Sequence, residues 1–112
     1  MPIRCEEYNQ VCVLSVDGDL TAENAGHLRT NSEERITNRQ VVDFIVDLEK
    51  CGFIDSEGLE TLLWLKRRSD DLFGQAKLVG LDENCRKILE ITRLDEQLEV
   101  FDTVIDAVKS FA

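Results

Sequence analysis

Histidine is nearly absent from this sequence, with one residue among 112, and the cysteines are scattered. The four cysteines are Cys5, Cys12, Cys51 and Cys85, and none has C-x-x-C spacing. A metal site needs several such ligands close together, and a hydrolytic serine usually lies in a Gly-x-Ser-x-Gly turn, which is missing. We therefore expect no metal and no enzyme activity, with His27 a surface residue and the cysteines reduced and largely buried.

Glycine-rich phosphate loops and long apolar runs are also missing. Gly58, Gly74 and Gly80 belong to separate turns, so there is no Walker or dinucleotide motif. We expect no cofactor and no tight ATP binding by the isolated chain. No stretch reaches about 18 consecutive apolar residues, and the first residues lack the apolar run of a signal peptide. These features predict a cytoplasmic protein that does not enter a membrane.

Basic residues are few, because 13 Lys and Arg stand against 23 Asp and Glu, for a net charge of −10. Such a chain repels nucleic-acid phosphates and anionic lipids, so we expect direct binding to neither. The one basic cluster, residues 66–68, is interpreted as a solvated helix face, with partner docking as the alternative. With 43% hydrophobic and 32% charged residues, the composition is typical of a globular protein, here one domain of residues 1–112.

Apolar, β-branched runs mark five strands. The predicted strands are residues 3–8, 11–16, 41–48, 76–81 and 98–101. The first two form a hairpin around Asn9-Gln10, in a register that does not place Cys5 opposite Cys12. The second strand is apolar almost throughout, which predicts an interior position in the sheet with cover on both faces.

Helical spacing marks four further segments, each between or after strands. The predicted helices are residues 22–37, 57–72, 83–92 and 102–110. Thr21 and Asp82 are predicted N-caps, and Gly74 is the expected stop of the second helix. The last helix is expected to bury Val104, Ile105, Val108 and Phe111. Strands that alternate with helices indicate a single α/β domain.

The segment Phe53–Leu59 places a hydroxyl, that of Ser56, at the N-terminus of the predicted helix 57–72. Free backbone N–H groups and the helix dipole favour an anion there, so a phosphate on Ser56 would be accommodated. The alternative is that Asp55 or Ser56 only caps the helix. Asp55 has two interpretations as well, a helix-stabilising acid or a group that orients the Ser56 hydroxyl for phosphoryl transfer.

Three further patterns stand out: Gly18-Asp19-Leu20 with Ala25 and Leu28, Asp47-Leu48 followed by Phe53–Leu59, and Ala76–Gly80 through Ile88–Leu94. In these segments the chain, from about residue 3 to residue 111, resembles the STAS domain, and within it the small bacterial anti-sigma factor antagonists. The resemblance implies a mixed β-sheet with helices packed mainly on one side.

The resemblance also implies a function. In phosphorylated family members, the serine that follows the aspartate, here Ser56, receives phosphate from an anti-sigma factor that is also a serine kinase. The unphosphorylated protein would capture that kinase and free a sigma factor, and a serine phosphatase would restore this state. The implied partner-binding residues are Asp19, Thr21, Asn24, Phe53, Asp55, Glu57, Gly58 and Leu59.

The alternative function is a constitutive STAS scaffold, or a subunit of a larger regulatory or transport assembly, in which Ser56 is only an N-cap. We expect a monomer or a weak dimer in either case. The chain departs from the family pattern at two positions: Thr21 stands where an Asp is common, and Glu57 stands where a small residue usually follows the phosphorylated serine. Glu57 therefore places a permanent charge beside the acceptor hydroxyl.

Overall fold

The computed structural model describes residues 3–111 as five strands, four α-helices and one 3₁₀ turn. The strands are β1 (Ile3–Tyr8), β2 (Val11–Asp17), β3 (Asp43–Lys50), β4 (Ala76–Val79) and β5 (Glu99–Phe101). The α-helices are α1 (Ala22–Arg39), α2 (Ser56–Asp71), α3 (Glu83–Ile91) and α4 (Val104–Ser110), and the 3₁₀ turn is η1 (Leu94–Glu96). The ends of the predicted domain 1–112 lie outside the described residues.

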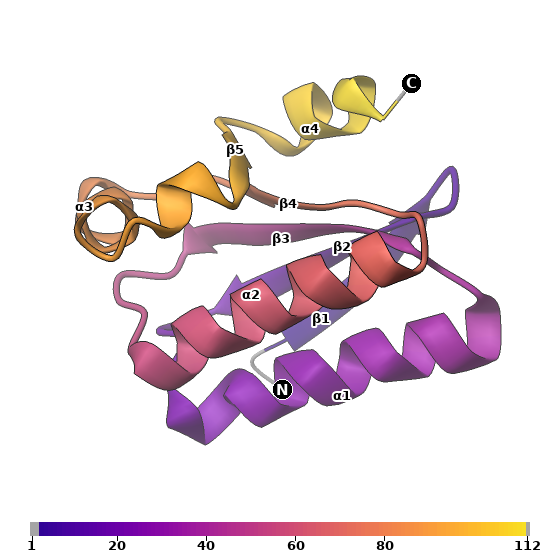
Figure 1. The fold of residues 1–112 in the computed structure, drawn as a ribbon, viewed down its shortest axis with the longest axis horizontal. Helices are drawn as coiled ribbons and strands as arrows, with labels where there is room; N and C mark the ends of the chain where they lie inside the picture. The colour runs from indigo at the N-terminus through magenta and orange to yellow at the C-terminus, as the bar shows by residue number, and fades with distance from the viewer. Residues whose placement is uncertain (1–2, 112) are drawn as a thin grey trace.

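The strands form one mixed sheet in the order β1-β2-β3-β4-β5 (Figure 1). β1 is antiparallel to β2, and every other neighbouring pair is parallel, so β2 has the interior position that was predicted. Asn9 and Gln10 turn the hairpin with φ of 50° and 70°, the left-handed conformation of a two-residue turn. Cys5 lies opposite Leu14, which confirms that Cys12 is not its cross-strand partner.

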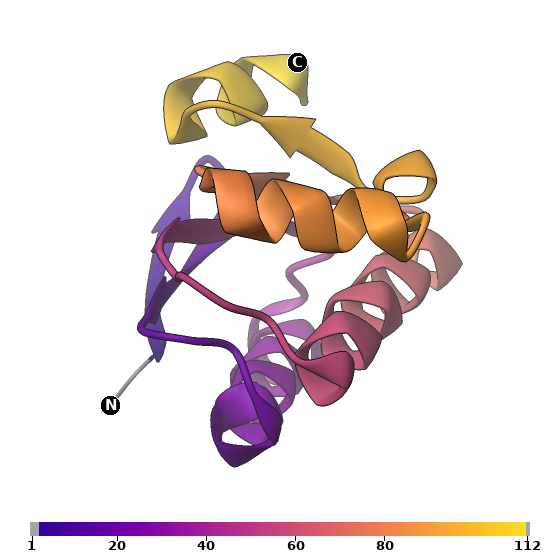
Figure 2. The ribbon, with the colours of Figure 1, turned by 90° about the vertical axis from the view of Figure 1, so that its left-hand side faces the viewer.

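Side chains alternate along the strands and build two hydrophobic clusters, one on each face of the sheet. α1 and α2 pack on the first face and α3 contributes to the same cluster, whereas α4 packs on the second face (Figures 1 and 2). The larger cluster includes Leu14, Phe44, Leu78 and Leu89, and the smaller one includes Val13, Ile45, Val79 and Ala107. The predicted mixed sheet with helices mainly on one side is therefore confirmed.

A buried lysine anchors α4 on the second face. Lys77 is only 2% exposed, and its Nζ donates a hydrogen bond to Ser110 Oγ at 2.6 Å. The same ammonium lies 4.3 Å from the ring centroid of Phe111 and 3.9 Å from the Glu99 carboxylate. A buried charge is tolerated only with such partners, so Lys77 fixes the end of the short helix to the sheet.

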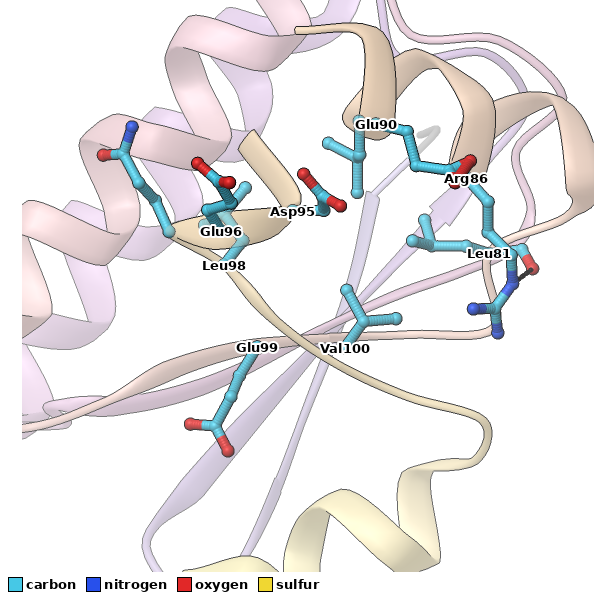
Figure 3. Close-up of a pocket in the computed structure, with 10 residues that line it drawn as sticks. Leu81, Arg86, Glu90, Asp95, Glu96, Leu98, Glu99 and Val100 are labelled. Atoms are coloured by element: carbon cyan, nitrogen blue, oxygen red, sulfur yellow. Dashed lines mark hydrogen bonds between the residues drawn. The ribbon is translucent and has the colours of Figure 1, made fainter. Parts of the chain in front are cut away.

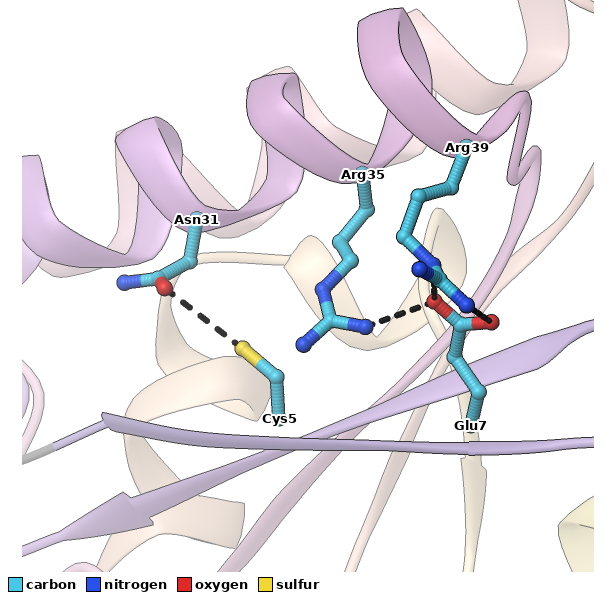
Figure 4. Close-up of polar contacts among 5 residues, drawn as sticks. All are labelled: Cys5, Glu7, Asn31, Arg35 and Arg39. Carbon is cyan, nitrogen blue, oxygen red and sulfur yellow. Dashed lines mark hydrogen bonds and ion pairs between the residues drawn. The ribbon is translucent and has the colours of Figure 1, made fainter.

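Polar contacts fasten α1 to the outer strand β1 (Figure 4). The Glu7 carboxylate accepts hydrogen bonds from Arg35 Nη1 and Arg39 Nε, both at 2.6 Å. One turn earlier, Cys5 Sγ donates to Asn31 Oδ1 at 3.6 Å. These contacts lie at the edge of the sheet, where α1 passes over β1. Polar groups suit this position because apolar packing alone would not close it to water.

Several element ends differ from the predictions by a few residues. α1 runs to Arg39 rather than residue 37, and it stops where Gln40 takes a left-handed conformation. β3 covers 43–50 rather than 41–48, and β4 and β5 are both shorter than predicted. Pairing and capping set these limits, and neither is visible in hydrophobic spacing.

The last helix begins two residues later than predicted, and one of the four residues expected to be buried in it is exposed. It begins at Val104, because the Thr103 hydroxyl accepts a hydrogen bond from the backbone N–H of Asp106. Ile105 was expected to be buried but is 66% exposed. The residues of α4 and its C-terminal end that pack on the sheet are Val104, Ala107, Val108 and Phe111, and this spacing directs Ile105 away from the sheet.

No helix among the described residues is long and apolar enough to cross a membrane.

Candidate functional site

Two loops at the same end of the sheet are joined by backbone pairing. Leu20, in the β2-to-α1 connection, forms a parallel bridge with Ile54 in the β3-to-α2 connection. The backbone N–H of Leu20 donates to Phe53 O at 2.9 Å, and that of Asp55 donates to Leu20 O at 3.1 Å. The predicted segments around Asp19 and Ser56 therefore form one continuous surface at the carboxyl ends of β2 and β3.

The Asp55 carboxylate ties two helices to this surface. Oδ1 accepts from the backbone N–H of Gly58 in the first turn of α2, and Oδ2 accepts from the backbone N–H of Ala22 at the start of α1, both at 2.9 Å. These hydrogen bonds, that from Gly58 first, hold the pKa of the Asp55 carboxyl below its ordinary value. Asp55 is thus a shared cap for both helix N-termini, a role that the sequence alone does not predict.

Ser56 is the first residue of α2, so the helix begins one residue earlier than predicted. The N-cap is Asp55, and the alternative in which Ser56 caps the helix is wrong. The Ser56 side chain is exposed, and no hydrogen bond to its hydroxyl is found among the described residues. It therefore stands free in solvent beside the N–H groups of a helix N-terminus.

Gly58 lies where the two loops come closest. A Cβ added to Gly58 would lie 2.4 Å from Leu20 O and 2.9 Å from Ile54 Cγ2. Because no side chain fits, glycine is required for the joined loops to exist in this form. Gly58 was predicted to contact a partner, but it is buried, so any influence on a partner acts through the shape of the loop.

The α1 side of the surface is polar and hollowed. Thr21 is the N-cap of α1, as predicted, and its backbone N–H donates to Asn24 Oδ1 at 2.9 Å. The Asn24 amide in turn donates to the backbone oxygen of Asp19 at 2.6 Å. A hollow of about 500 Å³ opens beside them, lined by Asp19, Thr21, Asn24, Glu23 and His27. The sequence did not single out Glu23 or His27 for this surface.

The α2 side carries the apolar part of the surface. Phe53 is 45% exposed, Leu59 is half-buried, and Glu57 is exposed beside Ser56. The joined loops therefore carry an exposed aromatic residue, acidic residues and the Ser56 hydroxyl within residues 53–59. Leu20 and Ala22 lie within the predicted segment 19–24, but their role in joining the loops was not predicted, because it is carried by backbone atoms, which leave no signal in residue type.

A second hollow, of about 560 Å³, lies between α3, η1 and β5 (Figure 3). Its border is acidic, with Glu90, Asp95, Glu96 and Glu99, and its interior includes Leu81 and Val100. It contains none of the residues predicted from the sequence. Arg86, on its edge, is already paired with Asp102 at 3.0 Å.

Comparison with known proteins gives the same fold. A candidate anti-sigma factor antagonist from Thermotoga maritima has a TM-score of 0.90 at 21% identity, over 96% of this chain and 92% of its own. The phosphorylated form of the Bacillus cell fate determinant SpoIIAA has a TM-score of 0.76 at 20% identity, over 98% and 99%.

A protein of the sulfate transporter family from Wolinella succinogenes is also similar, with a TM-score of 0.81 at 18% identity over 94% of this chain and 87% of its own. The fold is therefore shared by regulators and by a transporter-family protein. The family model described as the STAS domain matches residues 2–107. This chain belongs to the STAS domain family.

Proposed function

We propose that this chain is a phospho-switched binding module, an anti-sigma factor antagonist. In the unphosphorylated form it binds an anti-sigma factor that is also a serine kinase, and so frees a sigma factor. Phosphorylation of Ser56 ends the binding, and a serine phosphatase restores it. The protein acts in the cytoplasm as a binding partner and kinase substrate, without catalysis of its own and without contact to nucleic acid or membrane.

The observation that carries this proposal is the free Ser56 hydroxyl on the first residue of α2, at the centre of the joined loops. A kinase needs an acceptor hydroxyl that is exposed and not held by another group, and the α2 N-terminus favours the phosphate that results. SpoIIAA is a structural neighbour that has a phosphorylated form, and this supports the proposal that this chain is phosphorylated too.

The switch requires only a local change of charge. A phosphate adds about −1.5 to −2 charges at neutral pH. A partner packed on Phe53 and Leu59 would have to desolvate that phosphate and face it together with Asp55 and Glu57. Binding is lost for this reason, and no rearrangement of the fold is needed.

Substitutions at Ser56 test the proposal directly. Ser56→Asp is expected to weaken binding of the cognate anti-sigma factor, and Ser56→Ala is expected to retain binding while it abolishes phosphorylation. Calorimetry and phosphate transfer with purified kinase are the measurements, with circular dichroism to confirm that both variants are folded. Equal binding by Ser56→Asp and wild type would contradict the switch.

Glu57→Ser is a sharper test than the Ser56 substitutions, because it introduces the small residue that family members commonly have at this position. It should speed phosphorylation and widen the difference in affinity between the two states, since it removes a like charge beside the acceptor. Glu60→Ser, further along α2, is the matched control for the loss of one exposed acid on the same helix. If Glu60→Ser changes the phosphorylation rate and the affinity difference as much as Glu57→Ser does, the effect of Glu57 does not come from its position beside Ser56.

The extent of the partner surface can be mapped by hydrogen exchange. We expect protection at residues 19–24 and 53–59 when the anti-sigma factor is bound. Protection confined to residues 83–111 would exclude this surface.

The second candidate function, a constitutive scaffold or transport-assembly subunit, is favoured by the similarity to the sulfate transporter family protein. Mass spectrometry of protein from its own cells separates the two, since the scaffold needs no phosphate on Ser56.

A further inference from the structure

α4 covers only part of the second face of the sheet. It packs on β3, β4 and β5, and a groove of about 680 Å³ remains beside it, bordered by side chains of β1 and β2. The apolar side chains that line this groove are Tyr8, Val13, Val104, Ile105 and Val108. None of the residues proposed for the Ser56 surface takes part.

The groove has an exposed apolar border. Ile105 is 66% exposed and Tyr8 is 48% exposed, and both line the same hollow from opposite elements. Apolar side chains scattered singly on a surface need no explanation, but two large ones on either side of an apolar groove form a patch. Such a patch indicates an interaction surface.

The net charge of the groove lining differs from the net charge of the whole chain. Arg4 and Lys109 supply two positive charges, and Glu6 and Asp47 supply two negative charges, so its lining sums to zero. The whole chain carries −10. A second acidic copy would be repelled by most of the surface, but it meets no excess of like charge here.

We propose that a second copy of this chain docks on the groove, as a two-fold dimer in which Ile105 and Tyr8 of each copy cover the apolar lining of the other. A two-fold interface uses the same patch on both subunits, so the patch must be complementary to itself. A mixed-charge border that sums to zero meets this condition, whereas a border of one sign cannot.

The position of β1 favours the same arrangement. Within residues 3–111, β1 is an outer strand of the sheet that pairs with β2 alone, and it forms one side of the groove. Its other edge is open to a neighbouring strand. The groove lies beside a single seven-residue helix, which is a limited surface, so we expect a weak dimer whose population depends on concentration.

This dimer leaves the Ser56 surface free. α2 packs on the first face of the sheet and α4 on the second (Figure 1). Ser56 begins α2, whereas the groove lies beside α4. Each copy of the dimer could therefore engage its own partner. The inference does not depend on the function proposed for Ser56.

Sedimentation velocity over a range of concentrations tests the proposal. Wild type should shift from monomer to dimer as its concentration rises, and Ile105→Lys should remain monomeric over the same range. Ile91→Lys is the matched control, because Ile91 is 80% exposed on α3 and does not line the groove. A wild-type chain that stays monomeric throughout overturns the proposal, and so does equal loss of the dimer in both variants.

A charge test and an exchange measurement are independent of Ile105. Lys109→Glu should weaken the dimer several-fold, because it leaves the groove with a net negative charge, whereas Lys87→Glu on α3 makes the same change of charge elsewhere and should not. Hydrogen exchange of wild type at high concentration should show added protection at 3–8 and 104–110. Protection at 53–59 instead would overturn the proposed location.

Discussion

Asp55 and Ser56 are adjacent residues with separate roles. Asp55 accepts hydrogen bonds from the backbones of Gly58 and Ala22, whereas Ser56 contributes an exposed hydroxyl. Stability and the proposed phosphoryl acceptance would therefore be divided between two side chains. A substitution at Ser56 is then expected to change the proposed signal without changing the fold, which a switch requires.

This division predicts different effects on stability. Ser56→Ala should change the free energy of unfolding by less than about 0.5 kcal/mol, because it removes neither a cap nor a buried contact. Asp55→Ala should lower the melting temperature clearly, since two backbone N–H groups lose their acceptor. Thermal unfolding of the two variants is the measurement. Equal melting temperatures would contradict the shared-cap role of Asp55.

The hydrogen bonds that Asp55 accepts also make its contribution to stability depend on pH. The pKa of Asp55 is depressed in the folded state, so its stabilising effect is present above its ordinary value of 3.8 and is lost as pH falls through the folded pKa. The difference in melting temperature between wild type and Asp55→Asn should therefore shrink in acid. A difference that does not change with pH would show that Asp55 acts through packing instead.

Cys5 is the most reactive thiol that the structure predicts. Its pKa is lowered to about 7, first by the neighbouring Cys12 thiol and, against the opposing effect of burial, by the charge of Arg35. Burial raises the pKa of Cys51 and of Cys85. Since the thiolate is the nucleophile, iodoacetamide should modify Cys5 first, with a rate that rises through about pH 7.

Cys12→Ala is the variant that tests the cause of this low pKa. Without the Cys12 thiol, the alkylation midpoint of Cys5 should move up towards the ordinary value of 9.0. Peptide mass spectrometry after brief labelling at several pH values gives the midpoint. An unchanged midpoint in the folded variant would assign the effect to Arg35 alone.

The contact between the two loops is the structural feature on which the candidate site depends. Gly58→Ala should cost about 1–3 kcal/mol of unfolding free energy, because its Cβ would lie 2.4 Å from the backbone oxygen of Leu20. Gly26→Ala is the control, since Gly26 lies inside α1 with open space around it. That change should stabilise by about 0.5–1 kcal/mol. Urea unfolding measures both, and two changes of the same sign would contradict the close approach.

Sequence patterns predicted the elements well because hydrophobic spacing reports burial. The apolar run of β2 indicated cover on both faces, and Thr21 and Asp82 were recognised as caps from residue type. The wrong prediction for Ile105 has a physical reason. The exposure of Ile105 depends on which face of α4 meets the sheet, and a seven-residue helix contains too few turns for spacing to decide this.

The candidate site was predicted as a set of residues but not as a geometry. Ser56 and the segment around Asp19 were both named, yet nothing in residue type shows that one carboxylate joins two helices. The bridge of Leu20 with Ile54 is made by backbone atoms and spans more than thirty residues of chain. Such long-range pairing is visible only in the folded molecule.

At the scale of the whole molecule, excess acid is the dominant electrostatic feature. Nine ion pairs are found among the described residues, and four of them have both side chains exposed. Exposed pairs contribute only about 0–1 kcal/mol each. The net charge of −10 is left uncompensated and repels itself within a compact chain. Repulsion of this kind is screened over about 10 Å at 0.1 M salt, well within the dimensions of the domain.

We therefore expect potassium chloride to stabilise this protein. The urea midpoint should rise between low salt and about 0.1 M, because screening removes more repulsion among the acids than attraction within the exposed pairs. The double variant Glu60→Gln with Glu90→Gln removes two exposed acids that form no ion pair among the described residues, so its midpoint should be higher in low salt and less sensitive to added salt. A midpoint that falls with salt would mean that the ion pairs outweigh the repulsion. Because Ser56→Asp adds one further negative charge, as the proposed phosphorylation would, the same titration on this variant should give the steepest rise of the three.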